Sequence, residues 1–189
     1  MIRIGILGNI GSGKSYVAKN FGYPVFNADS EVIKLYKKDK RIFKKLKKVL
    51  PKYIYTFPIN KNEIIKAILA KELNLKKIVK IVHFEIRKKM NIFLKKNKKK
   101  KIIILDIPLL LENKLNKKND VLIFIHAQKS EILKRLRKRK NYDLRLINKF
   151  KKIQLPLKYK KNKSDFIIKN YFNKKSIKES IKKILKEIL

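Results

Sequence analysis

One eight-residue segment near the start of the sequence constrains its fold more than any other feature. Residues 8–15 read Gly-Asn-Ile-Gly-Ser-Gly-Lys-Ser and match the phosphate-binding loop pattern G-x-x-x-x-G-K-[ST]. The segment follows an apolar run, residues 2–7, that predicts a buried strand, and it precedes a stretch with helical periodicity. The pattern requires this context, because its glycines let successive amides point inward and the following helix adds its positive end. The segment therefore predicts a site for nucleotide phosphates.

The last two residues of the loop have chemical roles toward a bound nucleotide. Lys14 is expected to reach the β- and γ-phosphates, and the hydroxyl of Ser15 is expected to ligate Mg²⁺. A dinucleotide-binding fingerprint is excluded, because its G-x-G-x-x-G spacing would require a glycine at Tyr16.

The rest of the chain alternates short apolar runs with longer helical patterns. The apolar runs that predict strands are residues 2–7, 25–26, 102–105, 121–125 and 166–168. Helical patterns occupy residues 31–96, 130–139, 143–154 and the stretch from Ser176 onward. This alternation predicts an α/β fold with a parallel five-stranded sheet covered on both faces, and an all-helical insertion at about residues 31–98. At 189 residues, a single domain is expected.

Polar residues predict where three of these helices begin. The segments 60–63 and 176–179 have the spacing of capping boxes, with Asn60 and Ser176 as caps. Asp143 is expected to cap the helix that follows it.

The formal net charge is +39, and it comes almost entirely from lysine. Only seven of the 53 basic residues are arginine, the residue on which nucleic-acid readers depend for bidentate contacts. The even spread of lysine favours a solvated coat, in keeping with an AT-rich coding sequence, over a nucleic-acid surface. Such a coat still attracts small anionic substrates. A nucleic-acid-associated ATPase stays open as an alternative.

Several absences narrow the class further. The chain has no cysteine, which excludes disulfides and thiolate chemistry. No apolar run reaches the ~18 residues of a membrane span, and the first residues are too briefly apolar for a signal peptide. We therefore expect a cytoplasmic protein with a small-molecule substrate, no specific nucleic acid or membrane partner, and a monomer or weak homo-oligomer.

The residues after the loop disfavour nucleotide hydrolysis. GTPases need a D-x-x-G switch, and no glycine follows Gly22. Residues 162–165, Asn-Lys-Ser-Asp, imitate the guanine-reading motif N-K-x-D, but a chain so rich in Lys and Asn is expected to produce that match by coincidence. Motor ATPases end a strand in paired carboxylates, and this sequence has no two adjacent acidic residues. Phosphoryl transfer to a small bound acceptor is the reaction that fits.

Two aspartates each follow a predicted strand. Because the carboxyl ends of parallel strands meet at one edge, Asp29 and Asp106 are expected beside the phosphate loop. Such a kinase needs a base for the acceptor hydroxyl and a carboxylate near the metal, although an aspartate after a strand is as often a cap or turn residue. Arg135 and Arg139, spaced i and i+4, would form part of a lid or simply a solvated basic face.

Five motifs in order along nearly the whole chain resemble the dephospho-coenzyme A kinase family. Residues 8–15 resemble its G-G-I-G-S-G-K-S, 26–29 its I-D-A-D, 83–87 its H-P-x-I-R, and 106–112 its D-x-P-L-L-x-E. The spacing of its Q-x5-K-x4-D-x2-I-x-N is kept by Gln154, Lys160, Asp165, Ile168 and Asn170.

The resemblance implies a doubly wound, P-loop NTPase-like fold with a lid at about residues 139–160. It also implies transfer of the ATP γ-phosphoryl group to the ribose 3′-hydroxyl of dephospho-coenzyme A, the last step of coenzyme A synthesis. In that reaction Asp29 would act as the base, Lys14 and Arg139 would be further catalytic groups, and Ser15 and Asp106 would hold Mg²⁺. ATP and Mg²⁺ are therefore the expected cofactors.

The resemblance also assigns binding residues. Nucleotide contacts are expected from Asn9, Ile10, Gly11, Ser12, Gly13, Lys14, Ser15, Tyr16 and Asn170. Acceptor contacts are expected from Asp29, His83, Arg87, Pro108, Leu109, Leu110 and Glu112. Judged by its helical position alone, His83 would more often be a core histidine.

The chain departs from the family pattern at Asn9, Tyr16, Asn27 and Phe84. With Asn27 in place of the first aspartate of I-D-A-D, Asp29 alone would carry the role of base. Another small-molecule P-loop kinase, with a nucleotide or nucleoside acceptor, is the alternative within enzymes.

Overall fold

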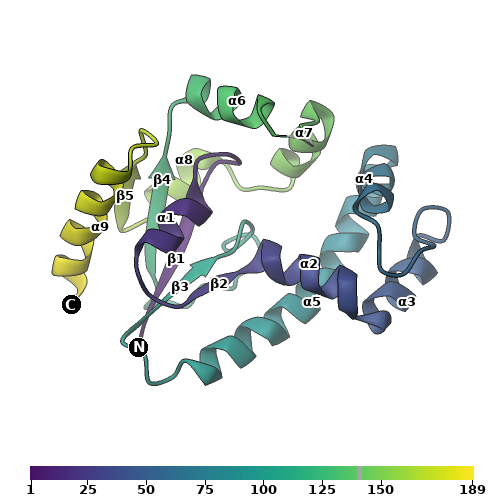
Figure 1. Ribbon diagram of the computed structural model, residues 1–189, viewed down its shortest axis with the longest axis horizontal. Helices are drawn as coiled ribbons and strands as arrows, with labels where there is room; N and C mark the ends of the chain where they lie inside the picture. Colours follow the sequence, from purple (N-terminus) through teal and green to yellow (C-terminus); the bar gives the residue numbers. More distant parts are fainter. Residues whose placement is uncertain (140–141) are drawn as a thin grey trace. The chain divides into compact units, whose positions relative to one another are not determined.

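The computed structural model describes residues 1–139 and 142–189, which form two compact units (Figure 1). Unit 1 comprises Met1–Asn27, Asn97–Tyr142 and Gln154–Leu189, and unit 2 comprises Ala28–Lys96 and Asp143–Ile153. Residues 140 and 141 of the predicted lid lie outside the described residues.

Unit 1 is built on a five-stranded, all-parallel sheet. Its strands are β1 (Ile2–Gly8), β2 (Val25–Asn27), β3 (Ile102–Asp106), β4 (Val121–His126) and β5 (Phe166–Lys169). Their order is β2-β3-β1-β4-β5, so β1 is central and the phosphate loop leaves the middle of the carboxyl edge. All four strand pairings are parallel, which confirms the predicted α/β class and parallel sheet. Near-continuous apolar strands of this kind are typical of parallel sheets that are covered on both faces.

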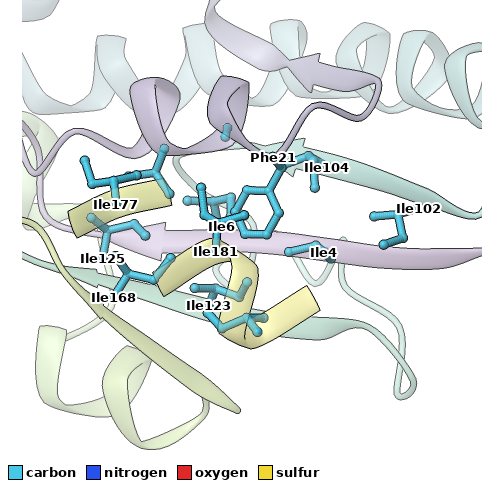
Figure 2. Packing of buried hydrophobic residues seen from close by; sticks show 13 residues of the cluster. Ile4, Ile6, Phe21, Ile102, Ile104, Ile123, Ile125, Ile168, Ile177 and Ile181 are labelled. Carbon is cyan, nitrogen blue, oxygen red and sulfur yellow. The ribbon is translucent and has the colours of Figure 1, made fainter. Parts of the chain in front are cut away.

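The two faces of the sheet are covered by different segments. α1 (Lys14–Asn20) and α9 (Lys174–Ile188) pack on one face, and Figure 2 shows their apolar side chains against those of β1, β3, β4 and β5. On the opposite face Gly5 gives room to Leu110 and Leu122: a Cβ at Gly5 would lie 2.6 and 2.8 Å from their methyl groups. α8 (Leu157–Asn162) also contacts β1, and α6 (Lys129–Arg137) follows β4.

Unit 2 is helical throughout its described elements. It contains α2 (Ala28–Lys38), α3 (Lys40–Val49), α4 (Lys61–Ala70), α5 (Glu72–Lys96) and α7 (Leu144–Lys152). α5 contacts α2, α3 and α4 along a buried apolar stripe, and α7 packs on α4. In the part of the chain that the structure describes, no helix combines the length and apolarity needed to cross a membrane.

Both predicted capping boxes are wrong, although Asn60 does cap α4 by accepting from the amide of Asn62. The carboxylate of Glu63 instead accepts from the hydroxyl of Thr56 and the amide of Tyr55, which stabilises the preceding loop from a buried position. The last helix, α9, begins at Lys174, three residues earlier than a helix capped by Ser176 would begin. Its cap is Asn173, whose side chain accepts from two amides of the first turn.

The predicted cap at Asp143 is confirmed. Its carboxylate accepts from the amides of Arg145 and Leu146 at 2.8 and 3.3 Å, so α7 begins at Leu144. The adjacent guanidinium and these amides lower the pKa of Asp143, since they stabilise the ionised carboxylate.

Candidate functional site

The phosphate loop, residues 8–15, connects the end of β1 to the start of α1. Gly11 and Gly13 adopt φ values of 84° and 89°, a region that side-chain-bearing residues rarely enter. α6 packs directly against this curl, because a Cβ at Gly11 would lie 3.0 Å from Leu136. The backbone therefore has the tight turns that the glycine spacing predicts.

The ammonium group of Lys14 lies across the loop. Its Nζ donates hydrogen bonds to the carbonyl of Asn9 at 2.8 Å and to that of Gly8 at 3.3 Å. The positive charge thus sits over the same turn whose amides the motif directs at phosphate oxygens. This placement is compatible with the predicted contact between Lys14 and the β- and γ-phosphates.

Asn170, directly after β5, is hydrogen-bonded to the phosphate loop. Its buried side chain donates to the carbonyl of Ser12 at 2.8 Å and accepts from the amide of Phe172 at 2.7 Å. The approach is close, because a Cβ at Gly13 would lie only 2.4 Å from the Asn170 amide nitrogen. Asn170 therefore shapes the backbone that would receive phosphate, and its direct contact with a nucleotide stays a prediction.

Two features beside Asn170 carried no signal in the sequence. The guanidinium of Arg135 lies 4.2 Å from the centroid of the Phe172 ring, a cation–π contact that joins α6 to the segment after β5. A cavity of about 180 Å³ lies at the carboxyl ends of β4 and β5. It is lined by His126, Ala127, Gln128, Lys169, Asn170 and Tyr171.

A polar cluster formed by Asn27, Asp106 and Ser15 lies at the carboxyl edge of the sheet. Asn27 and Asp106 are register partners at the ends of β2 and β3. The Asn27 side-chain nitrogen donates to a carboxylate oxygen of the buried Asp106 and, at 3.5 Å, to the hydroxyl of Ser15. One amide thus orients two oxygen ligands of the type that Mg²⁺ prefers.

This cluster fits a magnesium site that is completed by substrate. Mg²⁺ is usually bound by one or two protein oxygens together with phosphates and water. Across residues 1–139 and 142–189, no three His, Cys, Asp or Glu residues gather as a metal cage of their own. The oxygens of Ser15 and Asp106 would therefore contribute part of the coordination shell.

Asp29 belongs to unit 2, as the second residue of α2 and the second residue after β2 ends. The first turn of the same helix contains Glu31, which pairs with Lys34 at 2.6 Å. Carboxylates are stabilised at helix starts whatever their chemical role. The helix accounts for the residue type at position 29, and the function of Asp29 as a base stays a prediction.

His83 and Arg87 lie one turn apart on α5 of unit 2. Burial, followed by the charge of Arg87, lowers the pKa of His83, so the imidazole is favoured in its neutral form. Its Nε2 is buried without a hydrogen-bond partner among the described residues. The neighbouring Phe84 is exposed, and the ammonium of Lys88 lies 4.3 Å from its ring centroid.

Residues 107–115 follow β3 as a series of turns that contains the other predicted acceptor residues. Pro108 and Leu109 are partly exposed, whereas Leu110 is fully buried and offers a ligand no side-chain surface. Glu112 forms an ion pair with Lys160 at 2.6 Å. The sequence pattern included Lys160 but gave no reason for a buried lysine.

Arg139 lies in a turn after α6, and its backbone amide donates a hydrogen bond to the carbonyl of Leu136 at 3.0 Å. The predicted helix over 130–139 is confirmed except at its end: α6 ends at Arg137, so Arg135 and Arg139 do not share a helix face. Arg139 is exposed, and its role as a lid cation stays a prediction.

Asp165 has a structural role that accounts for the apparent guanine motif at 162–165. Its carboxylate accepts from the amide of Leu122 at 2.8 Å, and its own amide donates to the Leu122 carbonyl at 2.8 Å. These bonds fix the start of β5 against β4. The geometry favours the interpretation of the N-K-x-D match as coincidence.

Comparison with known proteins gives one consistent family. The model of the dephospho-CoA kinase family matches residues 2–176. A curated dephospho-CoA kinase from Wolbachia pipientis wMel is 36% identical over 187 residues, which cover 96% of this chain and 95% of the relative. One from Rickettsia conorii is 30% identical over 191 residues, covering 100% of this chain and 98% of the relative.

A solved structure from Campylobacter jejuni, described as a dephospho-CoA kinase, superimposes with a TM-score of 0.61 at 21% identity. The match covers 98% of this chain and 96% of that one. A crystal structure of a Thermus thermophilus protein gives a TM-score of 0.76 at 24% identity, covering 100% and 98% of the two chains. At these identities the structures support the fold.

Proposed function

The chain belongs to the dephospho-CoA kinase family, and on that premise we propose how its residues transfer the γ-phosphoryl group of ATP to the ribose 3′-hydroxyl of dephospho-CoA. The products are coenzyme A and ADP, and the reaction is the final step of coenzyme A biosynthesis. The observation that carries the proposal is the glycine-curled phosphate loop with the Lys14 ammonium across it.

The loop and Lys14 bind the triphosphate in this proposal. Backbone amides of residues 9–15 receive the phosphate oxygens, and Lys14 exchanges its carbonyl partners for the β- and γ-phosphates. Asn170 keeps the Ser12 carbonyl turned away, which leaves the loop in its receptive shape. The nucleotide base is assigned to the cavity beside Asn170.

The acceptor is oriented by groups that follow the sheet and lie on α5. Asp29 accepts the proton of the 3′-hydroxyl while the hydroxyl oxygen forms a bond to the γ-phosphorus. The bond between that phosphorus and the bridging oxygen of ADP breaks. His83 and Arg87 on α5 are assigned to the acceptor, as are Pro108 and Leu109 after β3. Arg139 stabilises the charge that moves to the leaving oxygens.

Ser15 and Asp106 are assigned to Mg²⁺, held in position by the amide of Asn27. Bound Mg²⁺ would neutralise charge on the β- and γ-phosphates. The protein contribution is the orientation of the two oxygens, which Asn27 fixes through its two hydrogen bonds.

An acceptor panel tests the proposed reaction. The protein is mixed with ATP, Mg²⁺ and one of five acceptors: dephospho-CoA, its 3′-deoxy analogue, a nucleoside, a nucleotide or RNA. ADP is expected only with dephospho-CoA, with 3′-phosphorylated product identified by mass spectrometry. Turnover with the 3′-deoxy analogue or with a nucleotide alone would contradict the assignment, and RNA binding that survives physiological salt would favour the nucleic-acid alternative.

A further inference from the structure

A buried ion pair in unit 1 lies outside the groups assigned above. Lys160 on α8 is 1% exposed at its side chain and Glu112 is 10% exposed, with 2.6 Å between Nζ and Oε1. Transfer of two such charges out of water is costly, and removal of one partner alone leaves the other uncompensated. A pair of this kind fixes the relative position of the two segments that carry it.

The same carboxylate oxygen has a second partner. Oε1 of Glu112 accepts a hydrogen bond from the backbone amide of Leu155 at 3.0 Å. Leu155 is the second residue of the chain after it returns to unit 1 from the segment 143–153. Glu112 therefore holds the point at which the C-terminal end of the proposed lid, residues 139–160, joins the sheet unit.

The other oxygen of Glu112 is not presented to a ligand. Oε2 is buried and has no hydrogen-bond partner within residues 1–139 and 142–189. A carboxylate that bound the acceptor directly would need an accessible oxygen, and here one oxygen is shared by two donors and the other is covered. The contacts of Glu112 thus favour a role inside the protein over the acceptor contact that the sequence resemblance implies.

We propose that Glu112 is a positioning residue, which acts through the backbone amide of Leu155 to anchor the C-terminal end of the lid segment. This rests on the proposed kinase function, because the lid carries the cation, Arg139, that meets the migrating charge. Loss of the anchor misplaces that cation in the transition state more than it weakens acceptor binding. It therefore lowers kcat and leaves the KM for dephospho-CoA nearly unchanged.

Two double variants separate the anchor from the charge pair. Glu112→Gln with Lys160→Met removes both charges but keeps an amide oxygen for Leu155. Glu112→Leu with Lys160→Met removes the charges and that acceptor together. Replacement of both members of a buried ion pair by residues of similar volume is often neutral for stability, so both variants are expected to fold. Circular dichroism and thermal unfolding check this.

Hydrogen exchange at the Leu155 amide and steady-state kinetics give independent readouts. In the Gln/Met variant we expect amide protection and kcat within about threefold of the parent protein. In the Leu/Met variant we expect loss of protection and a kcat lower by about tenfold or more, with KM for dephospho-CoA within about twofold. Leu155→Pro, which removes the backbone N–H donor and also fixes φ at this position, is expected to reproduce that kcat loss and serves if the Leu/Met protein fails to fold.

Two results would overturn the proposal. One is a KM for dephospho-CoA raised by about tenfold or more in the Gln/Met variant while Leu155 stays protected, which would make Glu112 an acceptor ligand. The other is an unchanged kcat when Leu155 is unprotected. A parent protein that fails to phosphorylate dephospho-CoA would instead refute the proposed function, and the exchange measurement would still report on the anchor.

Discussion

The side-chain amide of Asn27 donates a hydrogen bond to the carboxylate of Asp106, across the paired ends of β2 and β3. The family pattern that the chain resembles has an aspartate at the position of Asn27. Two carboxylates at this spacing would repel each other, whereas the amide supplies a donor and orients Asp106 without a bound cation. Asn27 thus supplies a neutral hydrogen-bond donor to Asp106 at a position where the family pattern has a carboxylate.

Replacement of Asn27 by aspartate is expected to make stability depend on Mg²⁺. Without metal, loss of the donor and the new repulsion should cost about 1–3 kcal/mol. Mg²⁺ alone should then raise the thermal midpoint of the variant more than that of the parent, because the cation relieves the repulsion. Asn27→Ala is the control, since it removes the donor without adding charge. A variant and parent with the same response to Mg²⁺ would disprove this account of Asn27.

Replacement of Asp29 by asparagine is expected to lower the transfer rate by at least ~10² while ATP binding is nearly intact, because the acceptor hydroxyl loses its base. Single-turnover transfer and equilibrium binding of ATP measure the two effects separately. Glu31→Gln, in the same first turn of α2, is the matched control and should retain the rate. If both variants retain it, Asp29 has no role as the base.

Alanine at Gly13 should damage the phosphate loop for two reasons. Its φ of 89° is unfavourable for a side chain, and the new Cβ would collide with Asn170 at 2.4 Å. We expect a lower thermal midpoint and weaker ATP binding. Gly22→Ala is the matched control, because Gly22 has a φ of 74° with open space around it. That variant should cost about 1–2 kcal/mol from backbone strain alone and bind ATP normally; equal loss of ATP binding in both variants would refute the collision.

The pKa of His83 should be measurable below its ordinary value of 6.5 by NMR titration, since burial and Arg87 both disfavour the imidazolium. The unfolded chain therefore binds more protons than the native state in this range, so this histidine makes stability fall as pH drops through 6.5. His83→Gln should flatten that part of the stability profile. Arg87→Gln should raise the pKa of His83, and an unchanged titration would show that Arg87 does not act on it.

The sheet and the phosphate loop were predictable from the sequence because each depends on local patterns. Apolar runs such as residues 102–105 have the length typical of buried strands, and the loop glycines occupy turns that other residues enter only with strain. The ends of helices were less predictable. Ser176 has the spacing of a cap, yet Asn173 is the residue whose side chain meets the first amides, and only the folded backbone decides between them.

The supporting contacts of the site could not be predicted, because they join segments far apart in the chain. Lys160 gives no sign in the sequence that it will be buried against Glu112, and many other lysines of this chain are solvated. The motif spacing pointed to Glu112 and Asn170 but not to their partners. A residue pattern indicates which side chains belong to a site, whereas tertiary packing decides which groups those side chains bond to.

The hydrogen bond between Asn170 and the Ser12 carbonyl spans 158 positions of sequence. During synthesis on the ribosome, the glycine turn therefore emerges long before the amide that holds it. A nascent chain therefore lacks this hydrogen bond to the phosphate loop until β5 has joined the sheet. A chain that stops before Asn170 would lack the side chain that donates to the Ser12 carbonyl.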